Sequence, residues 1–340
     1  MARRIIAPPP APPSRIAALE AAIVEDPDDV ATHLVLADAL LEAGDPRGEL
    51  IVAQVEDHAA RARELSAQFG SEIASLAGVP VQLDWRYGFV QRMSATLAAG
   101  EPIREPLAAA LAHPCMRVLA GLVVRCGVLR GTDAIDAIAA VRRPNLRALA
   151  IEEELGDSNE GRVDRETSAL WAQLPRLERL RLRSERALFD RIDHPRVRSM
   201  RLEVSPFTAR FEWKLPALES LDWDTHWLDC DTGAVDSLWR QELPALRDVT
   251  LHGFFVGPGL LANPSARRFL RGIDRLCVPD RLLVGDRDEL LAALARNADM
   301  FAHLSRLVVS RSLELYDADD VAAVQRALPN LELQAGSSSL

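Results

Sequence analysis

Residues 175–184 read Pro-Arg-Leu-Glu-Arg-Leu-Arg-Leu-Arg-Ser, and this segment decides the fold. Its leucines Leu177, Leu180 and Leu182 follow the spacing apolar-x-x-apolar-x-apolar. The same spacing occurs nine times, beginning at Leu119, Leu146, Leu177, Val197, Leu218, Leu246, Ile273, Leu304 and Leu328. Successive copies begin 20 to 31 residues apart. Self-similarity at such a period indicates repeated units that stack side by side and share one apolar core.

The spacers between the longer repeats predict helices. For example, Thr132 is a residue type that caps helices, and Ile135 and Ile138 follow it at helical spacing. A strand followed by a helix in each unit predicts an α/β fold, with parallel strands on a concave face and helices on a convex face. The two short steps, from Leu177 to Val197 and from Val197 to Leu218, leave room only for irregular or 3₁₀ connections.

Before the repeats, apolar residues first recur at helical spacing and then, over 79–98, alternate with other residues. We expect one helix capped by Ser14, a second that ends at Gly44, and a third from about Glu49 to Leu76. A β-hairpin is predicted over 79–98, and a helix over 103–112. The predicted domains are a proline-rich tail (1–13), a small all-helical domain (14–78), a hairpin and helix cap (79–113), the repeats (114–334) and a second tail (335–340).

Two segments resemble parts of a known bacterial family. Residues 19–51, which contain Leu-Val-Leu-Ala-Asp-Ala-Leu-Leu-Glu-Ala-Gly-Asp-Pro-Arg-Gly-Glu-Leu-Ile, resemble the repeat-companion domain that precedes leucine-rich-like repeats, notably in myxobacteria. Residues 85–90, Trp-Arg-Tyr-Gly-Phe-Val, are similar to the Trp-Arg-x-Gly-Phe-Val element that often links that domain to its repeats. The repeats themselves resemble leucine-rich repeats. The resemblance implies a leucine-rich-repeat-like solenoid in a bacterial protein-interaction scaffold, and no catalytic activity.

The composition excludes several classes of partner. The chain of 340 residues carries 40 basic and 50 acidic side chains, a formal net charge of −10. A general binder of nucleic acid or of an anionic membrane needs a basic surface, so we expect neither. No stretch approaches the roughly 20 apolar residues of a membrane span, and the residues after Met1 lack an apolar region of signal length. We therefore expect a cytoplasmic protein that is monomeric on its own.

No motif predicts a cofactor, a metal or catalysis. Lys214 is the single lysine, and no glycine-rich loop precedes it. The four cysteines, Cys115, Cys126, Cys230 and Cys277, form no Cys-x-x-Cys pair. We accordingly predict no cofactor, no metal ligand and no catalytic residue, and expect that the protein is not an enzyme.

The candidate binding residues lie on the predicted concave face. Side chains between the apolar positions of a strand point away from the core. Across the third to sixth copies these residues change from mostly arginine to mostly aspartate. They are the candidate partner-binding residues Arg179, Arg181, Arg183, Arg201, Glu203, Asp222, Asp224, Asp248 and His252. One interpretation is a salt ladder, Arg183–Glu203 and Arg201–Asp222, that only solubilises the sheet. The other is a polarised surface on which a partner protein docks.

The sequence favours a non-catalytic module that recruits, scaffolds or inhibits a partner protein. Two alternatives remain open at this point. The cluster from Asp222 to Asp231 contains three more acidic or imidazole side chains between its ends, and it could mark a degenerate enzyme or a metal site. The concave face could also bind a small ligand as a sensor.

Overall fold

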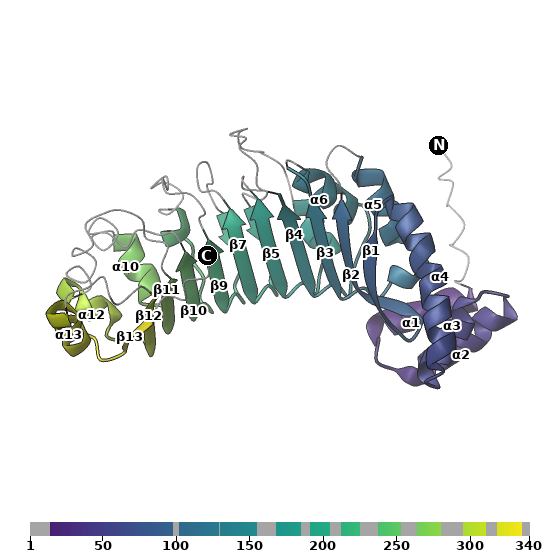
Figure 1. Ribbon diagram of the computed structural model, residues 1–340, viewed down its shortest axis with the longest axis horizontal. Coiled ribbons are helices and arrows are strands. Elements are labelled where there is room, and N and C mark those ends of the chain that lie inside the picture. The colour runs from purple at the N-terminus through teal and green to yellow at the C-terminus, as the bar shows by residue number, and fades with distance from the viewer. Residues whose placement is uncertain are drawn as a thin grey trace, which may run out of the picture.

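The computed structural model describes most of the chain between the two predicted tails, which lie outside it. The described residues are 14–97, 102–128, 130–154, 168–184, 191–204, 212–224, 237–252, 264–279, 295–310 and 318–334. Within these ranges no helix is both long enough and apolar enough to cross a bilayer. Figure 1 shows an elongated molecule with a row of strands between the N-terminal helices and a smaller group of helices at the far end.

Four helices precede the sheet: α1 (Arg15–Glu25), α2 (Val30–Glu42), α3 (Arg47–Val55) and α4 (Ala59–Ala77). The Ser14 hydroxyl accepts from the Ala17 amide and caps α1, as expected. The prediction of a single third helix was wrong, because the chain breaks between α3 and α4. Asp57 there has φ 58°, a left-handed conformation that interrupts a helix and that aspartate tolerates.

The predicted hairpin is confirmed as β1 (Val81–Arg86) and β2 (Phe89–Leu97), which pair antiparallel. Tyr87 and Gly88 form its two-residue turn with φ 48° and 77°, the geometry that matches the twist of antiparallel strands. The Gly88 amide donates to Gln54 Oε1 at 2.7 Å, which ties the turn to α3. Helix α5 (Arg104–Ala112) follows, also as predicted.

All nine copies of the repeated spacing form strands of one sheet. They are β3 (Gly121–Cys126), β4 (Ala148–Glu153), β5 (Arg179–Ser184), β7 (Ser199–Val204), β9 (Ser220–Asp224), β10 (Asp248–His252), β11 (Arg275–Pro279), β12 (Arg306–Ser310) and β13 (Leu331–Gln334). The sheet has 11 strands in the order β1-β2-β3-β4-β5-β7-β9-β10-β11-β12-β13, and every neighbouring pair from β2 onward is parallel. The α/β fold predicted from the sequence is confirmed.

The register explains why the spacing specifies this sheet. Leu180 lies opposite Leu149 on one side and Met200 on the other, so the second apolar position of each copy stacks on the next. These side chains belong to one continuous core that runs from Leu65 in α4 to Leu331 in β13. The repeat strands follow one another in chain order, so right-handed connections between them all lie on the same side of the sheet and leave its other face open.

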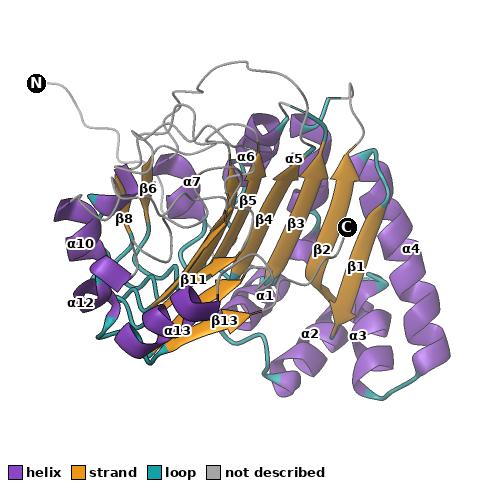
Figure 2. Cartoon of the chain, turned by 60° about the vertical axis from the view of Figure 1, so that its left-hand side comes forward, coloured by secondary structure: helices purple, strands orange, loops and turns teal. Residues whose placement is uncertain are grey.

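Helices cover one face of the sheet. They are α6 (Gly131–Ala139), α7 (Ser168–Gln173), α10 (Pro264–Leu270), α12 (Ala298–Phe301) and α13 (Ala318–Ala327), together with the 3₁₀ turn η1 (Pro114–Met116). Figure 2 shows the sheet bending along its length, with α5, α6 and α10 on its outer side. The exposed face is therefore the concave one.

The two short connections, from β5 to β7 and from β7 to β9, each contain a strand on the convex side, where irregular or 3₁₀ connections were expected. Strands β6 (Arg191–Asp193) and β8 (Glu212–Lys214) pair with each other in a parallel two-stranded sheet. Ile192 and Trp213 point into the core and are buried. A step of this length is too short for a helix, but three extended residues span ~10 Å and still cover the apolar strands beneath.

The N-terminal helices pack directly against the first repeats. Side chains of α4 share the core of β2 and β3. Glu20 of α1 is 4% exposed, and its carboxylate lies 3.0 Å from Arg47 and 2.7 Å from Arg117, which precedes β3. Arg176, which precedes β5, lies 3.2 Å from Glu25. The hairpin and helices thus cover both the backbone edge and the apolar end of the repeat sheet.

Candidate functional site: a charged ladder on the concave face

A ladder of ion pairs crosses the concave face from β3 to β10. We call it the concave ladder, and its members are Arg125, Glu152, Arg181, Arg183, Glu203, Arg201, Asp222 and His252. It arises because alternate residues of each strand face away from the core and the parallel register brings them side by side. The N–O distances along it run from 2.8 to 3.6 Å.

Glu203 is the centre of the ladder. Its Oε1 lies 3.0 Å from Arg181 and 2.8 Å from Arg201, and its Oε2 lies 3.5 Å from Arg183. The Glu203 side chain is 7% exposed, whereas these arginine side chains are 42–45% exposed. Burial alone would raise the pKa of Glu203, but the charges and hydrogen bonds of Arg181 and Arg201 outweigh it and hold the pKa below its usual 4.5. The carboxylate is therefore ionised beneath a layer of guanidinium groups.

The variant Glu203→Gln tests this arrangement through the pH dependence of stability. A carboxyl whose pKa is lower in the folded state stabilises the fold above its unfolded pKa, and the contribution is lost as pH falls through the folded value. At pH 7 we expect Glu203→Gln to lower the free energy of unfolding by about 1–3 kcal/mol, because Arg181 and Arg201 each lose one of two carboxylate partners and Arg183 loses the carboxylate that it contacts. Urea unfolding at a series of pH values should show this difference shrinking below about pH 4.

The exposed Glu219 provides the control, since its carboxylate lies 3.5 Å from a single exposed guanidinium, that of Arg198. Glu219→Gln is expected to change stability by at most a few tenths of a kcal/mol. A Glu203→Gln variant as stable as wild type at pH 7 would show that the ladder contributes nothing to the fold.

At its far end the ladder reaches β9 and β10. Asp222 lies 3.6 Å from Arg201 and 3.1 Å from Nε2 of His252. Burial would raise the pKa of Asp222, but the hydrogen bond from His252 and the charges of His252 and Arg201 lower it. Glu203 and Asp222 are thus both stabilised as anions at neutral pH.

The structure brings most of the sequence-predicted binding residues together. Both expected pairs, Arg183–Glu203 and Arg201–Asp222, are present. Asp224 is buried at the position opposite Glu203. Asp248 is outside the ladder, because Arg275 of β11 binds its carboxylate with two nitrogens. Arg179 forms no ion pair with any residue that the structure describes.

The face is not divided into a basic and an acidic half. Glu152 of β4 lies 3.3 Å from Arg181 and 3.0 Å from Arg125 of β3, so acidic groups are interleaved with the arginines. Neither Glu152 nor Arg125 was among the binding residues predicted from the sequence. Glu152 could have been predicted, because it alternates with Ala148 and Ala150 and lies opposite Arg183 once the repeat copies are aligned.

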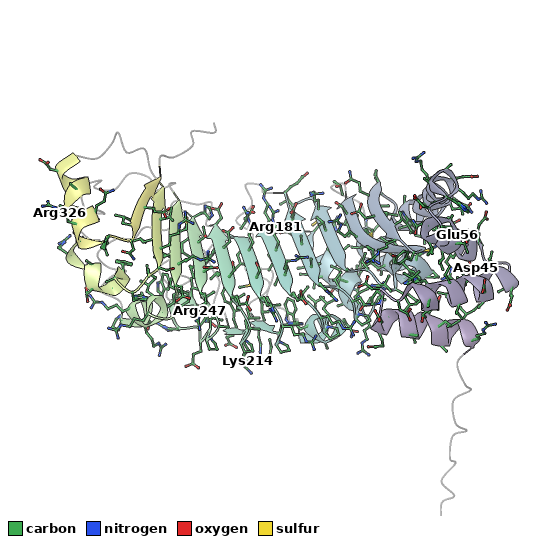
Figure 3. All side chains as sticks on the ribbon, turned by 90° about the horizontal axis from the view of Figure 1, so that it is seen from below. Asp45, Glu56, Arg181, Lys214, Arg247 and Arg326 are labelled. Atoms are coloured by element: carbon green, nitrogen blue, oxygen red, sulfur yellow. The ribbon has the colours of Figure 1, made fainter. Side chains whose placement is uncertain are left out.

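The convex side has a different character. The single lysine, Lys214 of β8, lies 3.5 Å from Asp193 of β6. Figure 3 shows Arg181 and Lys214 on opposite sides of the row of strands.

Cys115 and Cys126 are buried, and burial raises the pKa of each thiol to about 12, so neither is a ready nucleophile.

Of the cluster proposed as a metal or degenerate catalytic site, only Asp222 to Asp224 belong to the described residues, and the remainder lies outside them. Within the described ranges no three histidine, cysteine, aspartate or glutamate side chains gather so that they could hold a metal ion.

Comparison with known proteins adds a likeness in fold. No family model matches the sequence, and no curated protein matches it. A Bacteroides fragilis protein solved by a structural genomics consortium is similar in structure, with 13% sequence identity and a TM-score of 0.48 over 71% of each chain. At this level of similarity the comparison says nothing about what either protein does.

Proposed function

We propose that this chain is a non-catalytic interaction module that holds a partner protein on the concave face of its sheet, between β3 and β10. The observation that carries the proposal is the concave ladder, in which half-exposed guanidinium groups cover the buried carboxylate of Glu203 on a wide, open sheet. Arginine is among the residues that contribute most to protein interfaces, and charged groups orient a partner as it approaches.

Two further features support this function. The strand and helix repeats behind a helical N-terminal unit are the arrangement that the resemblance to leucine-rich-repeat proteins with a repeat-companion domain implies. Such repeats build an extended concave surface from units that contact only their neighbours. In addition, the ladder residues belong to strands with a continuous core behind them, so the surface is rigid and preorganised for binding.

The experiment is a quantitative affinity purification from the native host with two matched variants. In the concave variant, Arg179, Arg181 and Arg201 become glutamine. In the control, Arg142, Arg196 and Arg240, in the loops before β4, β7 and β10, become glutamine, which gives the same change in net charge. We use glutamine in place of glutamate because charge reversal would set new carboxylates against the buried Glu203.

We expect wild type and control to retain the same partner and the concave variant to retain at least about tenfold less of it, with a weaker dependence on salt. Circular dichroism should show unchanged helix and strand content in both variants. Equal recovery with all three proteins across a salt series would refute docking on this face, and the recruiting, scaffolding or inhibiting role would then need another surface.

A further inference from the structure

A shallow hollow of about 490 Å³ lies in the concave face beside the ladder, over β1 to β7. Its floor consists mostly of small side chains, because the outward positions of β3, β4 and β7 there are Gly121, Val123, Ala148, Ala150 and Ser199. Long side chains surround this floor, and the basic ones are Arg92, Arg179, Arg181 and Arg201. Small residues at the centre and arginines around it leave space for a ligand between guanidinium groups.

The hollow has an excess of positive charge. Asp84 is the one acidic residue that lines it, and Arg92 holds that carboxylate at 2.6 Å. Arg181 is paired with Glu203 at 3.0 Å and with Glu152 at 3.3 Å, and Arg201 with Glu203 at 2.8 Å and with Asp222 at 3.6 Å, so each keeps only some of its N–H donors for another group. Arg179 lies between Ala148 and Ser199 in the register, and neither neighbour can neutralise it. Arg179 has no ion-pair partner among the described residues and is therefore the guanidinium group most available to an anion, while Arg181 and Arg201 add the N–H donors that the ladder leaves unused.

The spacing of these arginines fits one kind of anion. Arg179 and Arg181 are alternate residues of β5, so their side chains leave the strand about 6.6–6.8 Å apart. Arg201 lies directly opposite Arg181 on β7, about 4.8 Å away at the backbone. Alternate side chains of any extended peptide have the same 6.6–6.8 Å spacing. We infer that the hollow binds an extended acidic segment of the partner protein, with carboxylates at alternate positions on Arg179 and on the Arg181–Arg201 pair. This inference rests on the proposed function and names the chemistry of the partner.

The lining favours a peptide over a nucleic acid. Single-stranded nucleic acids bind on aromatic side chains that stack with their bases. The hollow has no aromatic side chain among its lining residues. Its small floor instead suits the narrow backbone of an extended chain, and its guanidinium groups bind carboxylates with two parallel hydrogen bonds.

The test is fluorescence anisotropy of labelled peptides with the full chain at low and moderate salt. The probe is a peptide of alternating aspartate and serine. Two control peptides accompany it, one with asparagine in place of aspartate and one with the same residues in two blocks. A labelled single-stranded oligonucleotide provides the comparison with another polyanion.

Three protein variants identify the site. Arg179→Gln removes an arginine that has no ion-pair partner among the residues that the structure describes, so the ladder remains intact. Ala150→Leu fills the floor of the hollow without changing any charge. Arg142→Gln, in the loop before β4, is the charge-matched control. We expect Arg179→Gln and Ala150→Leu each to weaken binding of the alternating peptide by roughly tenfold, and Arg142→Gln to leave it unchanged.

Tight binding of the alternating peptide with those losses supports the inference. Equal binding of the two-block peptide, or no effect of Ala150→Leu, would show general attraction to a basic surface and overturn it. Tighter binding of the oligonucleotide would overturn the assignment to a peptide. If no peptide binds while the concave variant still loses the native partner, this inference fails and the proposed function stands. If the native partner is retained by the concave variant, the proposed function fails, whatever the peptides do.

Discussion

Removal of residues 1–98 is expected to convert the protein into an aggregate. The deletion removes α1 to α4 together with β1 and β2, and it exposes the whole edge of β3, which pairs with β2 from Gly121 to Cys126. An unpaired strand edge is a template for association with other chains. The deletion also uncovers the core around Leu122 and Val124, and each large apolar side chain returned to water costs about 1.5–3 kcal/mol. A few such losses equal the typical net stability of a domain, about 5–15 kcal/mol.

Size-exclusion chromatography with light scattering measures the outcome. The matched control lacks only residues 1–13, which precede every described helix and strand, and it should remain monodisperse with unchanged unfolding. A monomeric fragment of residues 99–340 that unfolds in one cooperative transition would contradict the capping role of the N-terminal helices and hairpin.

Substitution of Gly88 by alanine is expected to cost about 2–4 kcal/mol of stability. Two effects combine at this position. Gly88 has φ 77°, where an L residue is strained by about 1 kcal/mol. In addition, a Cβ there would overlap Cγ1 of Ile51, a fully buried side chain of α3. Either the hairpin or α3 must move, and both belong to the junction between the helices and the sheet.

Gly44 provides a close control, because its φ is 73° and a Cβ there would meet no atom within 4 Å. Gly44→Ala should therefore show the backbone strain alone, about 1 kcal/mol. Urea denaturation of both variants gives the two differences directly. Equal losses for Gly88→Ala and Gly44→Ala would mean that the contact with Ile51 does not restrict the turn.

The repeat strands could be predicted from the sequence because each copy carries its own complete pattern. Leu177, Leu180 and Leu182 specify a strand with one buried face, and stacking identical patterns leaves parallel pairing as the consistent solution. The hairpin was predictable for a similar local reason, since Tyr87-Gly88 supplies the turn. These features depend on residues close together in the chain.

The features that could not be predicted depend on a single backbone conformation or on residues far apart. The break at Asp57 depends on one residue in a left-handed conformation, which the spacing of apolar residues does not record. The small convex sheet forms because the connections from β5 to β7 and from β7 to β9 are both short, which places β6 and β8 side by side so that they pair. The Glu152 link in the ladder, by contrast, was available in the sequence, because aligning the copies that begin at Leu146 and Leu177 places Glu152 beside Arg183.

The most direct test of the central proposal is site-specific photo-cross-linking to the native partner. A benzophenone side chain at Ser220, an uncharged position on the concave face of β9, would report contact there. The same group at Asp193, on the exposed convex strand β6, is the control. Docking on the concave face predicts a covalent adduct with the partner from position 220 and none from position 193. An adduct from position 193 with none from position 220 would contradict it.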